Sequence, residues 1–172
     1  VDRLKHLEHE GYHFEVADAS LELLMRRAAG WHQDWFHMES FRVITDDQSP
    51  ETTAGEAPDG VTTEATIKVH VGEERLIATA EGNGPVNALD RALRVALDGR
   101  YPALDRVHLT DYKVRVLDTQ KGTGAITRVL LGTTDGEQTW TTIGVSENII
   151  EASWQALSDS LVYGLLRASD RG

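Results

Sequence analysis

At 172 residues, with a formal net charge of −11 and no cysteine, the chain can form one domain with a small appendage and bury roughly 70% of its unfolded surface. The negative charge, with no local basic patch found along the sequence, argues against nucleic acid or an acidic membrane surface as a partner. The lack of cysteine excludes disulfides, cysteine-bearing zinc sites and thiol catalysis, and neither a membrane-spanning apolar run nor a signal peptide is found. We therefore expect a soluble, cytoplasmic protein.

Two short helices are predicted at the start of the chain. Residues 2–10 form the first, which ends at Gly11, and either Asp18 or Ser20 caps the second, which ends at Gly30. The apolar residues of the second helix have helical spacing and should face the core: Leu21, Leu24, Met25 and Ala28. Residues 1–38 are therefore predicted to be a helical linker subdomain. Because Val1 lies inside a helical pattern, we expect the chain to be a piece of a longer protein.

Residues 39–172 predict a second, larger domain whose first unit is residues 39–100. A strand at residues 39–46 precedes an acidic loop at residues 46–60 that we expect to be mobile. Two alternating strands then follow from Thr62, joined by a tight turn at Gly72. Pro85 opens a helix that Gly99 closes. The apolar stripe of this helix is Leu89, Ala92, Leu93, Ala96 and Leu97.

The same plan recurs 64 positions later, in residues 101–172. Gly136 takes the place of Gly72, and Asn148 with Glu151 forms a capping box for the last helix. The helix residues Ala88, Ala92, Leu93 and Leu97 correspond to Ala152, Ala156, Leu157 and Leu161, so that one offset aligns the two units without gaps. We predict an α+β fold of two pseudo-symmetric β-β-β-α units packed together, since either unit alone is too small to be stable. The alternative is a coincidence of common α+β patterns.

One short motif suggests a metal. His9, Glu10 and His13 fit H-E-x-x-H, in which two imidazoles one helical turn apart bind zinc beside a catalytic glutamate. Gly11 lies inside the motif where the apolar pattern of the first helix stops, so we expect the helix to be broken and the two histidines to be solvated. A zinc hydrolase is kept as a minor alternative, and no other catalytic set is found.

The segment at residues 81–85 leads from a strand directly into a helix. Its glycines let a ligand approach the backbone, and the free amides of a helix start attract a carboxylate. Ser146 begins the equivalent segment of the second unit, so we predict two such amide clusters. The strand at residues 107–117 changes its alternation, which a bulge at Thr110 and Asp111 would explain. These features suggest a pocket for an aliphatic amino acid, with Asp111 or backbone carbonyls for the ammonium group. The alternative is that the glycines only make a turn and the apolar residues only fill the core.

Four ordered segments, at residues 39–43, 81–89, 111–117 and 144–153, resemble the carboxy-terminal part of the 2-isopropylmalate synthase and citramalate synthase family. The resemblance runs from about Gly11 to Arg167 and is closest to citramalate synthase. It implies a parent enzyme, an acyltransferase that condenses acetyl-CoA with pyruvate in a metal-bearing TIM barrel for branched-chain amino acid biosynthesis. The barrel motifs are absent here, so this fragment is expected to have no catalytic residues, no metal and no cofactor, while the parent would use a divalent metal.

The same resemblance implies a dimeric regulatory domain that binds isoleucine or leucine for feedback inhibition of the barrel. The effector residues it implies at the first helix start are Gly82, Asn83, Gly84, Val86 and Asn87. Those on or near the fourth strand are Leu109, Tyr112, Val116 and Ala125, to which Asp111 and Ser146 are added from the residue patterns. Asn87 departs from the small apolar residue that is common in leucine-binding relatives, which indicates either isoleucine as the effector or a rearranged pocket. The alternatives are a dimerisation module without a functional pocket and the regulatory domain of a 2-isopropylmalate synthase.

Overall fold

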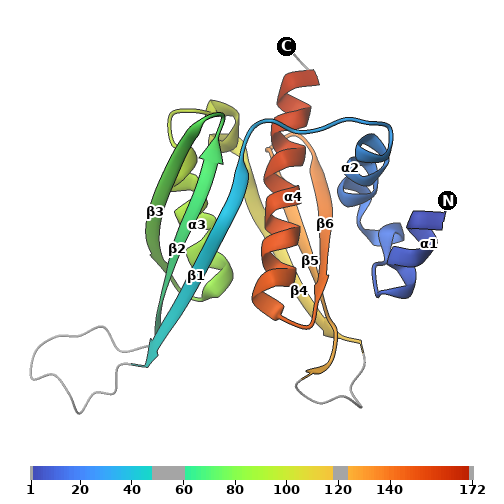
Figure 1. Ribbon diagram of the computed structural model, residues 1–172, viewed down its shortest axis with the longest axis horizontal. Helices are drawn as coiled ribbons and strands as arrows, with labels where there is room; N and C mark the ends of the chain where they lie inside the picture. The colour runs from blue at the N-terminus through green and yellow to red at the C-terminus, as the bar shows by residue number, and fades with distance from the viewer. Residues whose placement is uncertain (1, 48–60, 118–123, 171–172) are drawn as a thin grey trace, which may run out of the picture. The chain divides into compact units, whose positions relative to one another are not determined.

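The computed structural model describes residues 2–47, 61–117 and 124–170. These residues form two compact units (Figure 1). The α3 unit comprises residues 34–100, and the α4 unit comprises residues 1–33 and 101–172. Among the described residues, no helix is both long and apolar enough to cross a membrane.

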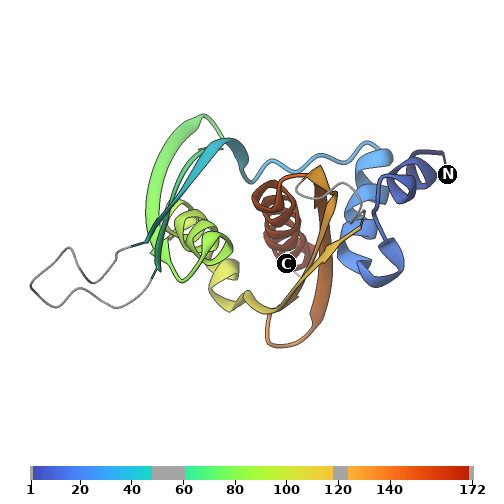
Figure 2. The same cartoon turned by 90° about the horizontal axis from the view of Figure 1, so that it is seen from below.

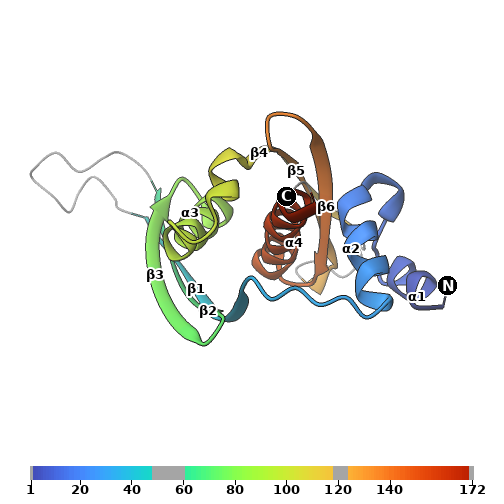
Figure 3. The same ribbon diagram turned by 90° about the horizontal axis from the view of Figure 1, so that it is seen from above.

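The α3 unit is a three-stranded antiparallel sheet covered on one face by a helix (Figure 3). The sheet has the order β1 (His37–Asp47), β2 (Val61–Val71) and β3 (Glu74–Gly82), and α3 (Pro85–Leu97) follows. Gly72 makes the β2–β3 turn with a φ of +60°, a left-handed conformation that glycine adopts without strain. Ile67 and Val69 of β2 are fully buried, as is the predicted stripe of α3, and residues 48–60 of the predicted loop lie outside the described residues.

The α4 unit repeats this topology. A 3-10 helix, η3 (Pro102–Arg106), leads into β4 (His108–Val116), β5 (Thr127–Thr134) and β6 (Thr139–Ser146), and the long helix α4 (Ile149–Asp170) covers one face. Gly136 makes the β5–β6 turn with a φ of +87°. The predicted α+β fold of two β-β-β-α units is confirmed.

The internal repeat holds for the helices and the tight turns, because the four helix positions of each unit that correspond at an offset of 64 are all buried. It is wrong for the first strands. β1 skips its pairing at Glu39 and β4 skips its pairing at Thr110, so the equivalent bulges lie 71 positions apart. The bulge predicted at Thr110 and Asp111 is confirmed, and β1 has a matching one that the sequence pattern did not indicate.

The chain's first two helices pack beside β6, the edge strand of the β4–β6 sheet, and α2 also contacts α4 (Figure 2). They are α1 (Asp2–His9) and α2 (Asp18–Ala28), joined by the 3-10 helix η1 (Phe14–Val16). Phe14 and Ala17 form a buried cluster with Ile143 of β6. The stripe predicted for α2 is partly wrong: Leu21 and Leu24 pack against this cluster, but Met25 is 64% exposed. Residues buried in α2 are Ala19, Ser20 and Leu23.

Either Asp18 or Ser20 was predicted to cap α2, and that prediction is wrong. The cap position is Ala17, which makes no side-chain hydrogen bond. Asp18 instead accepts a hydrogen bond from the Thr141 N–H at 2.8 Å, and the Ser20 hydroxyl accepts one from the Ile143 N–H at 3.0 Å. β6 is the edge strand of its sheet, and these side chains satisfy backbone donors that would otherwise be open to pairing with another strand.

Candidate functional site

The start of α3 presents open backbone amides. Gly84 is the N-cap residue, makes no side-chain cap, and is followed by Pro85 at the first helical position as predicted. The Asn87 side-chain oxygen accepts a hydrogen bond from the Asn83 N–H at 3.3 Å, so the Asn87 side chain holds the backbone of the loop before the helix. Ala88 is the first residue whose amide bonds back into the helix, to the Gly84 carbonyl at 2.9 Å. The amides of Val86 and Asn87 therefore precede the helical hydrogen-bond ladder, and they can donate to an anion.

The two glycines of this loop have different roles. A Cβ on Gly82 would lie 2.6 Å from the Ala88 backbone nitrogen, so glycine is required there for the helix to follow the strand so closely. A Cβ on Gly84 would meet no atom within 4 Å, and its φ of −177° is an extended conformation open to any residue. The fold itself therefore requires glycine at position 82 but not at position 84, where a side chain would point into open space.

The start of α4 is not equivalent to that of α3. The Asn148 side-chain oxygen accepts hydrogen bonds from the Ile150 N–H at 2.9 Å and the Glu151 N–H at 3.3 Å. The Asn148 N–H in turn donates to the Ser146 hydroxyl at 3.1 Å, and that hydroxyl donates to the Glu151 carboxylate. Asn148 is thus confirmed as the cap. The prediction of two open amide clusters is wrong for α4, because side chains of the chain already occupy its first amides.

The predicted residues on β4 divide between the two faces of the sheet. Leu109, Tyr112 and Val116 pair opposite residues of β5 that face α4, and the Tyr112 hydroxyl lies 3.0 Å from that of Ser153 in α4. Tyr112 and Val116 stay 42% and 48% exposed. Asp111 points to the opposite face, where Lys113 pairs with it and the hydrogen bond from the Lys113 ammonium lowers the pKa of the Asp111 carboxyl. The structure therefore does not bring Asp111 together with the other three.

The remaining predicted residues lie in both units. Ala125 is buried just before β5, and Ser146 ends β6 opposite Thr127. Gly82, Asn83, Gly84, Val86 and Asn87 belong to the α3 unit, while the β4 residues, Ala125 and Ser146 belong to the α4 unit. The role of these residues in binding an effector stays a prediction.

A polar cluster that the sequence did not indicate lies between α2 and α4. Asp159 of α4 accepts hydrogen bonds from Arg27 at 2.8 Å and from Ser20 at 3.2 Å. Burial raises the pKa of the Asp159 carboxyl, and the Arg27 charge partly offsets that rise. A hollow of about 320 Å³ opens beside it, lined also by Tyr12, whose hydroxyl donates to Gln155 at 2.9 Å. The pairing fixes α2 against α4, two helices that are far apart in sequence.

The H-E-x-x-H segment does not form one helix. α1 ends at His9, and Gly11 has a φ of +112°, so the predicted interruption at Gly11 is confirmed. His13 precedes η1, and its Nε2 lies 3.7 Å from the carboxylate of Glu15, two residues further along the chain. The two imidazoles are thus not one helical turn apart. Within residues 2–47, 61–117 and 124–170 no group of three or more histidine or acidic side chains is placed to hold a metal ion.

Two β-β-β-α units with bulged first strands and a helix pair at the start define a duplicated α+β domain. A family model for the LeuA allosteric (dimerisation) domain matches residues 15–165. The chain belongs to this family, and the resemblance inferred from the four sequence segments is confirmed.

Individual relatives agree with this family. The (R)-citramalate synthase of Streptomyces coelicolor is 54% identical over 170 residues, which cover 98% of this chain and 30% of that protein. The (R)-citramalate synthase of Aquifex aeolicus is 47% identical over 176 residues, covering 100% of this chain and 31% of the relative. A 2-isopropylmalate synthase of Shewanella frigidimarina is 30% identical over 159 residues, covering 91% and 27%. The chain thus spans about 30% of the length of the curated relatives it matches.

Proposed function

We propose that this chain is the regulatory part of an (R)-citramalate synthase and that it binds a branched-chain amino acid. The chain is 47–54% identical to two (R)-citramalate synthases over nearly its whole length, but 30% identical to a 2-isopropylmalate synthase. These identities support a citramalate synthase, rather than a 2-isopropylmalate synthase, as the parent enzyme. In that parent, a barrel outside this chain would hold the divalent metal and condense acetyl-CoA with pyruvate. The chain's own part is then to sense the end product.

The single observation that carries the binding proposal is the open start of α3. Gly84 leaves outward space, and the amides of Val86 and Asn87 have no place in the helical ladder. An effector carboxylate placed there would gain several N–H donors and the positive end of the helix dipole. We propose isoleucine as the first choice of effector and leucine as the second.

The test is titration calorimetry of the chain with isoleucine, leucine and valine side by side, repeated on Gly84→Ala. The added methyl group meets no protein atom, so the fold should lose no more than about 1 kcal/mol from the poorer N-cap residue. It would stand where the carboxylate approaches, and we expect isoleucine affinity to fall at least tenfold. Glu73→Ala, in the exposed β2–β3 turn, is the matched control and should leave affinity unchanged. Isoleucine binding that survives Gly84→Ala intact would exclude this placement.

Homodimerisation is the second part of the proposal, and the family's dimerisation role supports it. An apolar stretch of β4 that remains 41–48% exposed, Tyr112, Val114 and Val116, supports it further, because such residues are commonly covered by a partner. Sedimentation equilibrium should give twice the chain mass of 19.0 kDa. A monomer at every concentration tested would refute it.

A dimerisation module without a working pocket is the second candidate, favoured by the self-capped start of α4. Thermal unfolding distinguishes the two. A ligand at 100 times its dissociation constant stabilises the folded state by about 2.7 kcal/mol, so a bound effector must raise the melting temperature. Dimerisation without any shift from the three amino acids would favour the module.

A further inference from the structure

A cluster of basic side chains lies on the face of the β4–β6 sheet that the N-terminal helices leave uncovered at β4. Arg115 of β4 pairs directly opposite Arg128 of β5, and Lys113 lies two residues along the same face. They line a hollow of about 450 Å³ together with a histidine and three apolar residues, all within the α4 unit. We call it the arginine hollow, and its lining residues are His13, Val16, Lys113, Val114, Arg115, Arg128 and Leu130.

The two arginines are an electrostatic cost that the described part of the fold does not offset. Like charges directly opposite each other on antiparallel strands destabilise a sheet. Burial lowers the pKa of Arg128, and the charge of Arg115 lowers it further. Arg128 donates through Nε to the Gly11 carbonyl, and neither arginine has a carboxylate partner among the described residues.

Two acidic side chains lie near this face. Asp111 is bound by Lys113, and Glu15 lies 3.7 Å from His13. The chain as a whole carries a net charge of −11, so two arginines gathered on one small surface make the local field more positive than that of the rest of the chain. The sequence shows no basic patch here because Lys113, Arg115 and Arg128 are not consecutive, and strand alternation and strand pairing bring them together.

From this geometry we infer that the arginine hollow binds the phosphoryl groups of a phosphorylated small molecule. Directly opposed residues have Cβ atoms about 4.5–5.5 Å apart, so both guanidinium groups can donate to one phosphoryl group. Val16 and Leu130 supply apolar surface for the organic part of the ligand.

A phosphoryl ligand fits better than a carboxylate because of its charge and its number of acceptor oxygens. A phosphate monoester carries about −1.5 to −2 at pH 7 and accepts hydrogen bonds through three oxygens, so it can offset both arginines at once. This site is separate from the start of α3 and lies on the sheet face opposite Tyr112 and Val116. The inference therefore does not depend on the proposed amino acid effector.

The test uses the 172-residue chain and titration calorimetry with inorganic pyrophosphate and with ADP, at constant ionic strength. We expect saturable binding that weakens about tenfold to a hundredfold in Arg115→Gln, as expected for loss of a charge-assisted hydrogen bond. Arg42→Gln, an exposed arginine of β1 in the α3 unit, removes the same charge and should leave binding unchanged. Succinate, a dianion without phosphorus, should bind at least tenfold more weakly than pyrophosphate.

A second measurement keeps the test independent of folding. Arg115 makes no hydrogen bond with the described residues, so Arg115→Gln should melt at or slightly above the wild-type temperature without ligand. Pyrophosphate should raise the melting temperature of the wild type and not that of the variant. Absence of saturable binding, equal affinity in Arg115→Gln, or succinate binding as tightly as pyrophosphate would each overturn the assignment.

Discussion

Replacing Gly144 of β6 by alanine tests how closely α4 is held against its sheet. A Cβ at this position would lie 1.8 Å from the Ala152 carbonyl oxygen, 2.8 Å from its carbon and 3.0 Å from the Gln155 Cβ. Carbon to oxygen contacts normally lie at about 3.3–3.6 Å, so strand and helix must separate by roughly 1.5 Å. The atoms met first belong to the backbone of α4, and no rotation of a side chain can relieve the contact.

The cost follows from the burial around this contact. Ala152, Ala156 and Leu157 of α4 are fully buried, so separating the helix from the sheet opens a packed core. Overpacking a core costs 1–3 kcal/mol in typical cases, and a clash between two backbones should lie at the upper end, about 3 kcal/mol. For a chain of this size that corresponds to a fall in melting temperature of about 6–12 °C.

Urea unfolding followed by circular dichroism measures the effect, with Gly124→Ala as the matched control. A Cβ on Gly124 meets no atom within 4 Å, so the same substitution there should change the free energy of unfolding by less than about 1 kcal/mol. A Gly144→Ala midpoint equal to that of Gly124→Ala would show that α4 is not held as closely as described here.

Three further predictions concern single contacts. The hydrogen bond from Arg75 lowers the pKa of Glu39 to about 2 from its ordinary 4.5, so the ionised carboxylate stabilises the fold above pH 4.5 and this contribution is lost as the pH falls towards 2. NMR titration should find this low pKa for Glu39, and the Glu39→Gln variant should not lose this stability when the pH falls. A Glu39 pKa near 4.5 would contradict the pairing with Arg75. Asn148→Ala should cost about 1 kcal/mol in urea unfolding by uncapping α4, and an unchanged midpoint would refute the cap. Ser20→Ala should lower the free energy of unfolding by about 1–3 kcal/mol and speed hydrogen exchange at the Ile143 amide. An unaltered exchange rate at Ile143 would argue against the hydrogen bond from its amide to Ser20.

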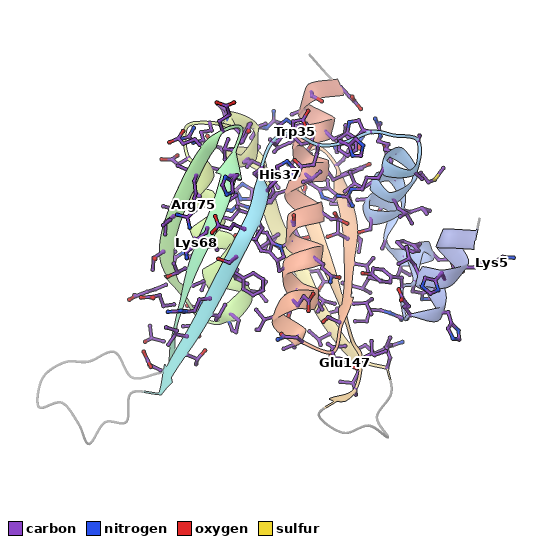
Figure 4. The ribbon with its side chains drawn as sticks, viewed as in Figure 1. Lys5, Trp35, His37, Lys68, Arg75 and Glu147 are labelled. Atoms are coloured by element: carbon purple, nitrogen blue, oxygen red, sulfur yellow. The ribbon has the colours of Figure 1, made fainter. Side chains whose placement is uncertain are left out.

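The Arg75 and Glu39 pair lies on the sheet face of the α3 unit that is turned away from α3, where Figure 4 labels Arg75 and Lys68. Glu39 is the unpaired bulge residue of β1, and His70 lies 3.0 Å from its carboxylate. The bulge thus places a carboxylate between two basic side chains of neighbouring strands. Sequence patterns cannot find this contact, because His70 and Arg75 meet Glu39 only through the strand register.

Helix starts show where reading the sequence succeeds and where it fails. Pro85 and Asn148 were placed correctly, because a cap acts within three or four residues of itself. Asp18 and Ser20 have the same local signature, yet they accept hydrogen bonds from a strand more than 120 residues away. A side chain does not cap its helix when it instead accepts a hydrogen bond from a distant backbone N–H on the open edge of a sheet.

By itself, the amino-acid sequence determined the elements, their order, the duplicated plan and the family, because apolar periodicity, glycine turns and helix caps depend on residues close together in the chain. Only the tertiary structure decided which helix start keeps open amides, and that Arg115 meets Arg128. Those properties depend on bulges and strand register, and a shift of one residue in register moves every side chain to the other face.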